Sequence, residues 1–160
     1  MGNLRRTQDM QRQRTTYSVP GPDFIWCCDG HDKLAEWGIE IYAGIDAYSR
    51  YIPWIYVGIS NRKPLSIAMQ YAQIVKGRGK HPNVLRTDRG KETTLLGEIH
   101  FALARSSKPG TKLSESHFYG TSRKNVRIEQ WWGQLQKSQL GRWRVRHNPN
   151  PDISSMSTEY

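Results

Sequence analysis

Three acidic residues of the sequence lie beside stretches that are expected to form regular structure. Asp29 ends the apolar run FIWCCD, Asp88 ends HPNVLRTD, and Glu129 lies early in RIEQWWGQLQKSQL. Carboxylates about 4 Å apart repel by roughly 4 kcal/mol per pair at an effective dielectric of 20. A pair of Mg²⁺ or Mn²⁺ ions removes this conflict, and two such ions promote phosphoryl transfer by activating a hydroxyl and stabilising the leaving oxygen. Spacing alone leaves other triplets open, because the chain holds 14 acids.

A mixed sheet is the element that would bring two of these acids together. FIWCCD has the length and continuity of a strand buried on both faces, and IEIYAGID alternates in the manner of a second strand. YIPWIYVGI reads as a third strand, which should lie at a sheet edge because Pro53 has no N–H to donate. If the strand that ends at Asp88 pairs with the first strand, Asp29 and Asp88 lie side by side.

Helical patterns follow the strands. Residues 63–79 place apolar residues at helical spacing after a proline suited to a first turn, 92–106 form a second candidate, and 116–122 read as a short strand and loop. In the last helix an apolar face can hold Glu129 at its margin. The sequence predicts a mixed α/β domain with helices on both faces of one sheet. The two expected apolar faces are Leu65, Ala68, Met69, Ala72 and Val75 in the first helix, and Ile128, Trp131, Trp132 and Leu135 in the last.

Other residues compete for a functional role. Asp32 is expected to be a loop acid, and Asp46 a turn former ahead of AYSR. His31 could touch a phosphate or act near a metal, although a lone loop histidine is more often incidental. The spacing of Trp131 and Trp132 favours core packing over stacking on bases.

Composition points to a polyanionic partner. Lys and Arg number 24 against 14 Asp and Glu, which gives a formal charge of +10 and a pI near 9.9. Nucleic acid is the first expectation and an anionic membrane surface the second. No apolar run approaches the roughly 18 residues of a spanning helix, and no signal peptide is recognisable, so the chain is expected to be soluble and intracellular. The adjacent Cys27 and Cys28 fit reduced, buried strand residues.

Basic residues gather around the last helix. Between residues 123 and 147 the only acid is Glu129, and a one-sided helix end of this kind favours phosphate contacts. Such contacts position DNA but read little of its sequence. The basic residues are Arg123, Lys124, Arg127, Lys137, Arg142, Arg144 and Arg146.

The motifs WCCDGHDKL, GIDAYSRYI, RTDRG and RIEQWWGQL together resemble the integrase catalytic core of retroviruses, retrotransposons and related DDE transposases, and are most similar to integrase-core proteins of fungal genomes. The resemblance implies an RNase H-like fold with a five-stranded mixed sheet whose third strand is at an edge. It also implies DNA strand transfer, with Asp29, Asp88 and Glu129 as catalytic acids that bind two Mg²⁺ or Mn²⁺ ions. Element ends and target duplex would be the partners, the nucleus the location, and self-association is left open.

Composition predicts a basic flexible arm at 1–22 and a disordered tail at 144–160, and the resemblance assigns 23–143 to a core-like domain. Two features depart from the retroviral pattern: the interval from Asp88 to Glu129 is slightly longer than usual, and Arg89 stands where Asn is common. No His/Cys zinc module precedes the core. A non-catalytic nucleic-acid-binding remnant of a mobile element, and a nuclease that only hydrolyses, are therefore the alternatives.

Overall fold

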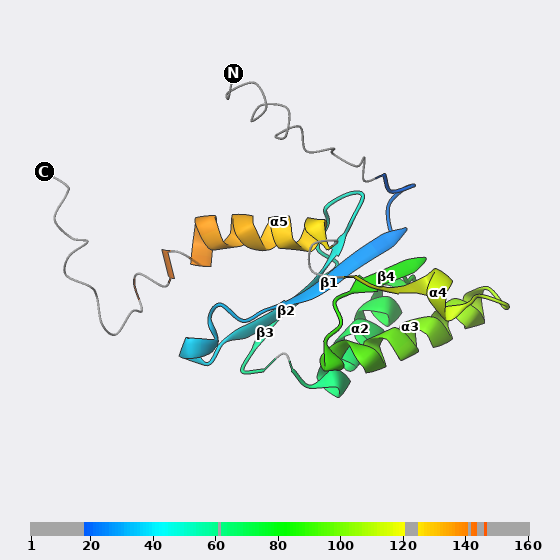
Figure 1. The fold of residues 1–160 in the computed structure, drawn as a ribbon, viewed down its shortest axis with the longest axis horizontal. Coiled ribbons are helices and arrows are strands. Elements are labelled where there is room, and N and C mark those ends of the chain that lie inside the picture. The colour runs from blue at the N-terminus through cyan, green and yellow to red at the C-terminus, as the bar shows by residue number, and fades with distance from the viewer. Residues whose placement is uncertain (1–17, 61, 121–124, 141, 144–145, 147–160) are drawn as a thin grey trace, which may run out of the picture.

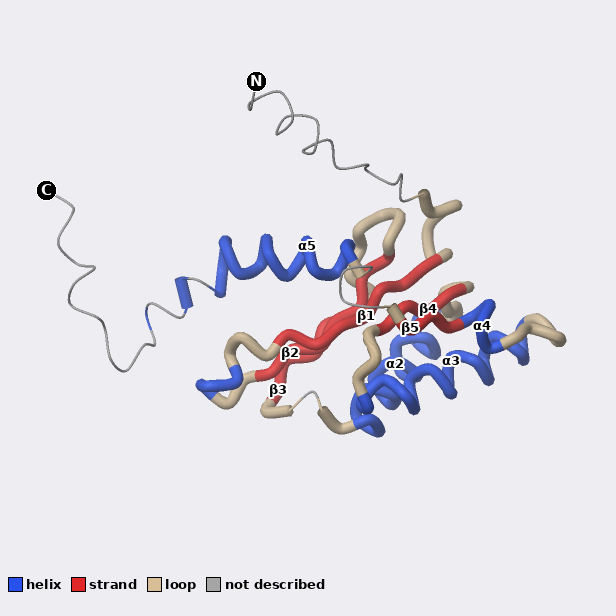
Figure 2. Tube along the Cα trace, viewed as in Figure 1, coloured by secondary structure: helices blue, strands red, loops and turns tan. Residues whose placement is uncertain are grey.

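A five-stranded mixed sheet forms the centre of the protein. The computed structural model describes residues 18–60, 62–120, 125–140, 142–143 and 146. The strands are β1 (Ile25–His31), β2 (Glu40–Asp46), β3 (Trp54–Gly58), β4 (Val84–Thr87) and β5 (His117–Tyr119), in the spatial order β3-β2-β1-β4-β5. Antiparallel pairing joins β1, β2 and β3, whereas β1, β4 and β5 are parallel (Figure 2). This arrangement confirms the predicted five-stranded mixed sheet.

Helices cover both faces of the sheet, as Figure 1 shows. On one face lie α2 (Pro64–Arg78) and α3 (Thr94–Ser107), with the short α4 (Leu113–Ser116) leading into β5. On the other face lies α5 (Val126–Leu135), which continues as a π-helical turn over Gln136–Leu140. Short 3₁₀ turns, Ala35–Trp37 and Lys91–Thr93, complete the described elements. No helix within these described ranges is both long and apolar enough to cross a membrane.

The central strand β1 contributes to a separate core on each face. Cys27 packs with Ile41, Ile45 and the α5 residues on one side, whereas Trp26 and Cys28 pack under α2 and α3 on the other. Neighbouring residues of a strand point to opposite faces, so the adjacent cysteines are both buried without facing each other. The prediction of a strand buried on both faces is confirmed, and neither Cys27 nor Cys28 forms a disulfide.

The strand that follows Pro53 lies at the edge of the sheet, as predicted. Pro53 lies directly before β3, and β3 is the terminal strand of the sheet. The preceding turn is held by Asp46, whose carboxylate accepts hydrogen bonds from the backbone N–H groups of Tyr48 and Ser49 and from the Ser49 hydroxyl. The expectation that Asp46 is a turn former is therefore confirmed.

The buried face of α2 differs from the predicted one. Ala68 and Val75 of the predicted face are buried, but Leu65 and Met69 are exposed, at 62% and 52% of their surface, and the helix buries Ile67 and Tyr71 in their place. The i, i+4, i+8 row from Ile67 meets the rings of Trp26 and Trp54, which fill the space beneath the sheet. The helix therefore turns the face that contains Tyr71 toward these rings. The spacing of apolar residues in the sequence did not predict this face.

The domain boundaries stay a prediction, since residues 1–17 and most of 144–160 lie outside the described part of the chain. Val19, within the segment assigned to the arm, packs in the α5-side core. The last helix presents Ile128 and Trp132 as buried residues, with Trp131 and Leu135 packed against the same core. Its predicted apolar face is therefore confirmed.

Candidate active site

Parallel pairing of β1 with β4 brings Asp29 and Asp88 to neighbouring positions. Cys27 pairs with Arg86 in the register, and two residues further along each chain lie Asp29 and Asp88. Adjacent strands are about 4.8 Å apart, so this extension of the register sets the two acids side by side. Asp29 lies within β1 and pairs with Ala43 of β2, whereas Asp88 follows the end of β4.

Two hydrogen bonds tie α5 to β1 around Asp29. The buried Asn125 amide donates from Nδ2 to the Cys28 carbonyl at 3.1 Å, directly before α5 begins. About two turns later, Trp132 donates from Nε1 to Asp29 Oδ2 at 3.3 Å. Glu129 lies between these two anchors, exposed in the first turn of α5. The anchors therefore fix the part of the helix that carries Glu129 beside the strand that carries Asp29.

The electrostatics of Asp29 show that the three acids act on one another. Burial above all, then the charge of Asp88 and, less strongly, that of Glu129 raise the pKa of the Asp29 carboxyl to about 7. Hydrogen bonds from Trp132 and from the Gly30 backbone oppose this rise in pKa. A carboxylate held in this way is destabilised by its neighbours and would gain from a nearby cation.

The segment after β4 shapes the surroundings of Asp88. The Gly90 backbone N–H donates to Asp88 Oδ1 at 3.3 Å, while the hydroxyls of Thr87 and Thr93 donate to the Asp88 carbonyl at 3.0 and 3.2 Å. Thr93 is fully buried and also donates to the Gly90 carbonyl at 2.7 Å. These bonds fold the chain back on itself at Asp88 and hold its backbone in place.

The donor set fits hard divalent cations in chemical kind. Asp29, Asp88 and Glu129 offer only carboxylate oxygens, which Mg²⁺ and Mn²⁺ prefer. Across the described ranges, however, no three His, Cys, Asp or Glu side chains are gathered closely enough to hold a metal ion as they stand.

The competing candidates lie elsewhere or have structural roles. Asp32 is largely exposed and lies 4.0 Å from Arg62, as expected of a loop acid. His31 is buried at the end of β1 and stacks on the Trp132 ring at 4.7 Å, so it supports the indole that bonds Asp29. Trp132 therefore serves both the core and the site, whereas the sequence pattern favoured the core alone.

The predicted nucleic-acid contacts are only partly described. Arg123, Lys124 and Arg144 lie outside the described residues. Arg127 is half-buried in α5, Lys137 is exposed in the π-helical turn, and Arg142 is exposed after it. The π-helical turn that carries Lys137 begins at Gln136, directly after α5 ends at Leu135.

Sequence reasoning missed Asn125 as a functional residue. The only sequence pattern that could have pointed to Asn125 is its position directly before a helix, because Asn is preferred at helix starts. Its side chain nevertheless makes no cap hydrogen bond and reaches instead to Cys28, 97 positions earlier in the chain. A contact over that sequence distance has no local pattern.

Comparisons with known proteins identify the family and the fold of the chain. The family model described as "Integrase core domain" matches residues 16–147, and the chain belongs to that family. The catalytic core of HTLV-2 integrase, solved with magnesium in a trimeric form, is similar at a TM-score of 0.51 and 14% identity, over 84% of this chain and 80% of that one. No curated protein matched.

A second similar structure comes from a larger assembly. It is the simian T-cell lymphotropic virus intasome in complex with PP2A regulatory subunit B56 gamma, with a TM-score of 0.50 and 15% identity. The match covers 83% of this chain and 45% of that chain. At such identities the likeness shows the fold, which is the RNase H-like one predicted from the motifs. The fungal resemblance stays a prediction.

Proposed function

We propose that this chain is a metal-dependent polynucleotidyl transferase core that joins DNA 3′ ends to a target duplex. The observation that carries the proposal is the raised pKa of Asp29, which reflects its burial and the charges of Asp88 and Glu129 on an integrase-core fold. Asp29 and Asp88 would hold one Mg²⁺ or Mn²⁺ ion, and Asp29 and Glu129 the other. When bound, two such ions supply activation of the attacking hydroxyl and stabilisation of the leaving oxygen.

The residues of the chain hold this site together. Asn125 and Trp132 set α5 against β1, and the Trp132 N–H orients the Asp29 carboxylate. The bonds of Thr93 and Gly90 hold the Asp88 segment. Basic residues around α5 would bind the DNA phosphates; those predicted are Arg123, Lys124, Arg127, Lys137, Arg142 and Arg144. Element ends and target duplex are the proposed partners, and the nucleus is the proposed location.

A strand-transfer assay tests the reaction. The protein is mixed with labelled element-end and target duplexes in Mn²⁺, and joined products are resolved by size. Asp88→Asn and Glu129→Gln are expected to lower product formation at least 100-fold, because each removes one anionic ligand. Asp32→Asn is the matched control, since it removes the same charge from an exposed loop acid, and it should retain activity. Undiminished product with Asp88→Asn and Glu129→Gln would eliminate this site.

Metal binding gives a readout that does not need the DNA substrate. Mn²⁺ should raise the melting temperature of the wild-type protein, because a ligand that binds only the folded state stabilises it. The rise should be largely lost in Asp88→Asn and kept in Asp32→Asn. An equal rise in all three proteins would place the bound ion elsewhere.

The remnant hypothesis is favoured by one observation: the acids of the described residues are not gathered into a ready metal site. Tight duplex binding without turnover in any metal would support a remnant. Products that end in a new hydroxyl from water, with none joined to a DNA 3′ end, would support a hydrolytic nuclease instead. Absence of duplex binding at low salt would contradict both the transferase and the remnant.

A further inference from the structure

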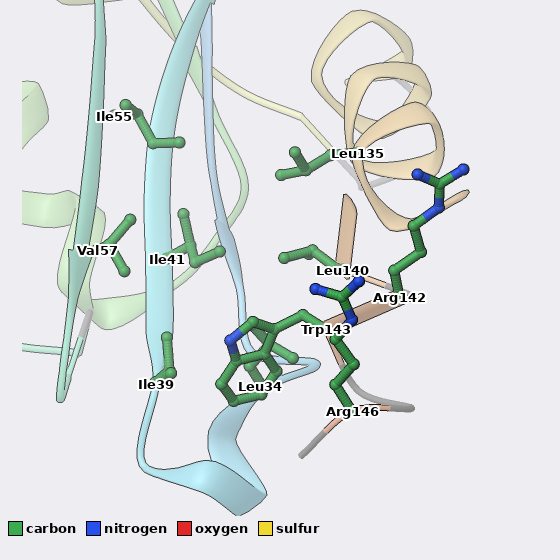
Figure 3. Close-up of a pocket in the computed structure, with 10 residues that line it drawn as sticks. All are labelled: Leu34, Ile39, Ile41, Ile55, Val57, Leu135, Leu140, Arg142, Trp143 and Arg146. Atoms are coloured by element: carbon green, nitrogen blue, oxygen red, sulfur yellow. The ribbon is translucent and has the colours of Figure 1, made fainter. Parts of the chain in front are cut away.

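An apolar groove of about 500 Å³ lies beside the C-terminal part of α5, as Figure 3 shows. The sheet supplies its floor through Ile41, Ile55 and Val57. Leu135, Leu140 and Trp143 form the opposite wall, and the Trp143 ring reaches toward Leu34 and Ile39. The volume is in the range of sites that bind ligands or side chains of a partner.

The floor of the groove extends onto a sheet face that α5 leaves uncovered. Ile55 and Val57 pair with Ala43 and Ile41 of β2, so they share the α5 side of the sheet. Their exposed fractions are 49% and 59%, and Ile59, two residues further along, is exposed to 86%. Two alternate exposed apolar residues on an edge strand, with a third just past its end, are unusual, because exposed edges generally carry charges that prevent association. The apolar side chains of Ile55 and Val57 on this face are therefore accessible to a partner.

The rim of the groove carries positive charge. Arg142 and Arg146 line it, and no acidic side chain is among its lining residues. In Figure 3 the Arg146 guanidinium lies beside Leu140, whereas Arg142 extends along the outside of the wall. The occupant should therefore combine apolar side chains with carboxylates. A second copy is disfavoured since the chain carries a formal charge of +10. DNA offers the negative charge without the apolar side chains.

We infer that this groove binds an acidic amphipathic helix of a partner protein, parallel or antiparallel to α5 on the uncovered face of β3. The apolar stripe of the helix covers Ile55 and Val57 and packs against Trp143, while its carboxylates face Arg142 and Arg146. Helix-in-groove recognition of this kind uses apolar residues at i, i+3, i+4 and i+7. The inference stands apart from the proposed catalysis, because it involves neither Asp29, Asp88 nor Glu129.

Three pools of fluorescein-labelled helical peptides of one length test the inference on the full chain. The first has Leu or Ile at i, i+3, i+4 and i+7 with Glu or Asp on its flanks; the second replaces the acids by Lys; the third keeps the acids and replaces the apolar positions by Ser. Anisotropy at low salt should show the first pool binding at least tenfold more tightly than either of the others.

Matched variants place the binding on the groove. Val57→Asp puts a carboxylate on the floor and should weaken the first pool at least tenfold, whereas Leu65→Asp makes the same change at an exposed site on α2 and should have no effect. Arg146→Glu should weaken binding, and Lys108→Glu, at the C-terminus of α3, should not.

Several outcomes would overturn the inference. Equal binding of the Ser pool would show that the groove recognises only negative charge and that Arg142 contributes to DNA binding alone. Failure of the first pool to bind, or equal weakening by Leu65→Asp, would remove the site. A concentration-dependent dimer that excludes the peptides and is lost in Val57→Asp would assign the face to a second copy.

Discussion

Asp29 carries a carboxyl group whose ionised form is disfavoured both by burial and by neighbouring acids. Its folded-state pKa of about 7 lies above the ordinary aspartate value of 3.8, chiefly because of burial. Between these two values the folded chain keeps the Asp29 proton while the unfolded chain releases it. In the metal-free protein the contribution of Asp29 to stability therefore falls as pH rises from about 4 and is fully lost above about 7.

Asp29→Asn should consequently stabilise the metal-free protein at pH 8. The expected gain is on the order of 1–3 kcal/mol, which is a rise of several degrees in melting temperature, and it should be small at pH 4. Thermal unfolding in EDTA at both pH values measures it, with Asp32→Asn as the neutral reference. A variant less stable than wild type at pH 8 would show that the carboxylate is well satisfied without metal.

His100 is the opposite case. Burial lowers the pKa of its imidazole to about 4, and the nearby His81 and His117 add to the effect. Its Nδ1 forms a 2.7 Å hydrogen bond with the Tyr71 hydroxyl beneath the sheet. The unfolded chain takes up this proton near pH 6.5, so the stabilising contribution is present above that pH and is lost as pH falls toward 4.

Replacing His100 by Asn should make stability less dependent on pH between 4 and 6.5. The variant loses packing and is expected to be less stable at neutral pH. The comparison therefore uses the slope of the unfolding free energy against pH rather than its absolute value. Urea unfolding at several pH values measures this slope. An unchanged slope would assign acid sensitivity to other groups.

At the scale of elements, the attachment of α5 to β1 is the feature on which the site depends. Asn125 is buried with the Cys28 carbonyl as its acceptor, so Asn125→Ala leaves that carbonyl without its donor. The expected loss is about 1–3 kcal/mol of unfolding free energy. Val126→Ala, at the neighbouring exposed position, should cost less than about 0.5 kcal/mol. Denaturant titration distinguishes the two, and equal losses would deny Asn125 its role as an anchor.

Trp132→Phe separates packing from hydrogen bonding at the second anchor. The ring still fills the α5-side core and stacks near His31, but the donor to Asp29 is gone. Because that bond lowers the Asp29 pKa, its loss should raise the pKa further and shift the pH profile of strand transfer toward alkaline values. Activity measured from pH 6 to 9 tests this shift. A lower rate with an unmoved profile would indicate a packing role only.

Elements could be predicted from the sequence where a local pattern decides them. The apolar run of β1, the alternation of β2 and Pro53 before β3 predicted these strands and the edge position of β3, and the i, i+3, i+4 pattern predicted the α5 face. The five-stranded mixed sheet as a whole was predicted only from the resemblance to the integrase core. The buried row of α2 could not be predicted, because it depends on Trp26 and Trp54 from distant strands. The Asn125 contact and the groove beside Trp143 depend on chain segments far apart in sequence for the same reason.

At the scale of the whole molecule, positive charge and fold act together. Antiparallel strands on one side of β1 and parallel strands on the other let the centre of the sheet receive acids from both halves of the chain. Of the predicted basic residues, Arg127 lies in α5 and Lys137 and Arg142 follow it, so the chain segment that carries Glu129 also carries positive charge that attracts a polyanion. The concentration of basic residues around α5 was predicted from the sequence. Arg123, Lys124 and Arg144 of that set lie outside the described residues.

Salt dependence tests whether the α5 region contacts DNA. Each phosphate neutralised releases counterions, so the logarithm of affinity should fall linearly with the logarithm of salt concentration. Lys137→Ala should weaken binding uniformly across duplex sequences and reduce the steepness of that line by about one. Lys108→Ala removes an equal charge at the end of α3, on the other side of the sheet, and should leave the line unchanged. Anisotropy titrations between 50 and 200 mM salt measure the salt dependence of both variants. Equal effects of the two substitutions would mean that DNA binding depends only on net charge. No effect of Lys137→Ala would place the DNA contact away from α5.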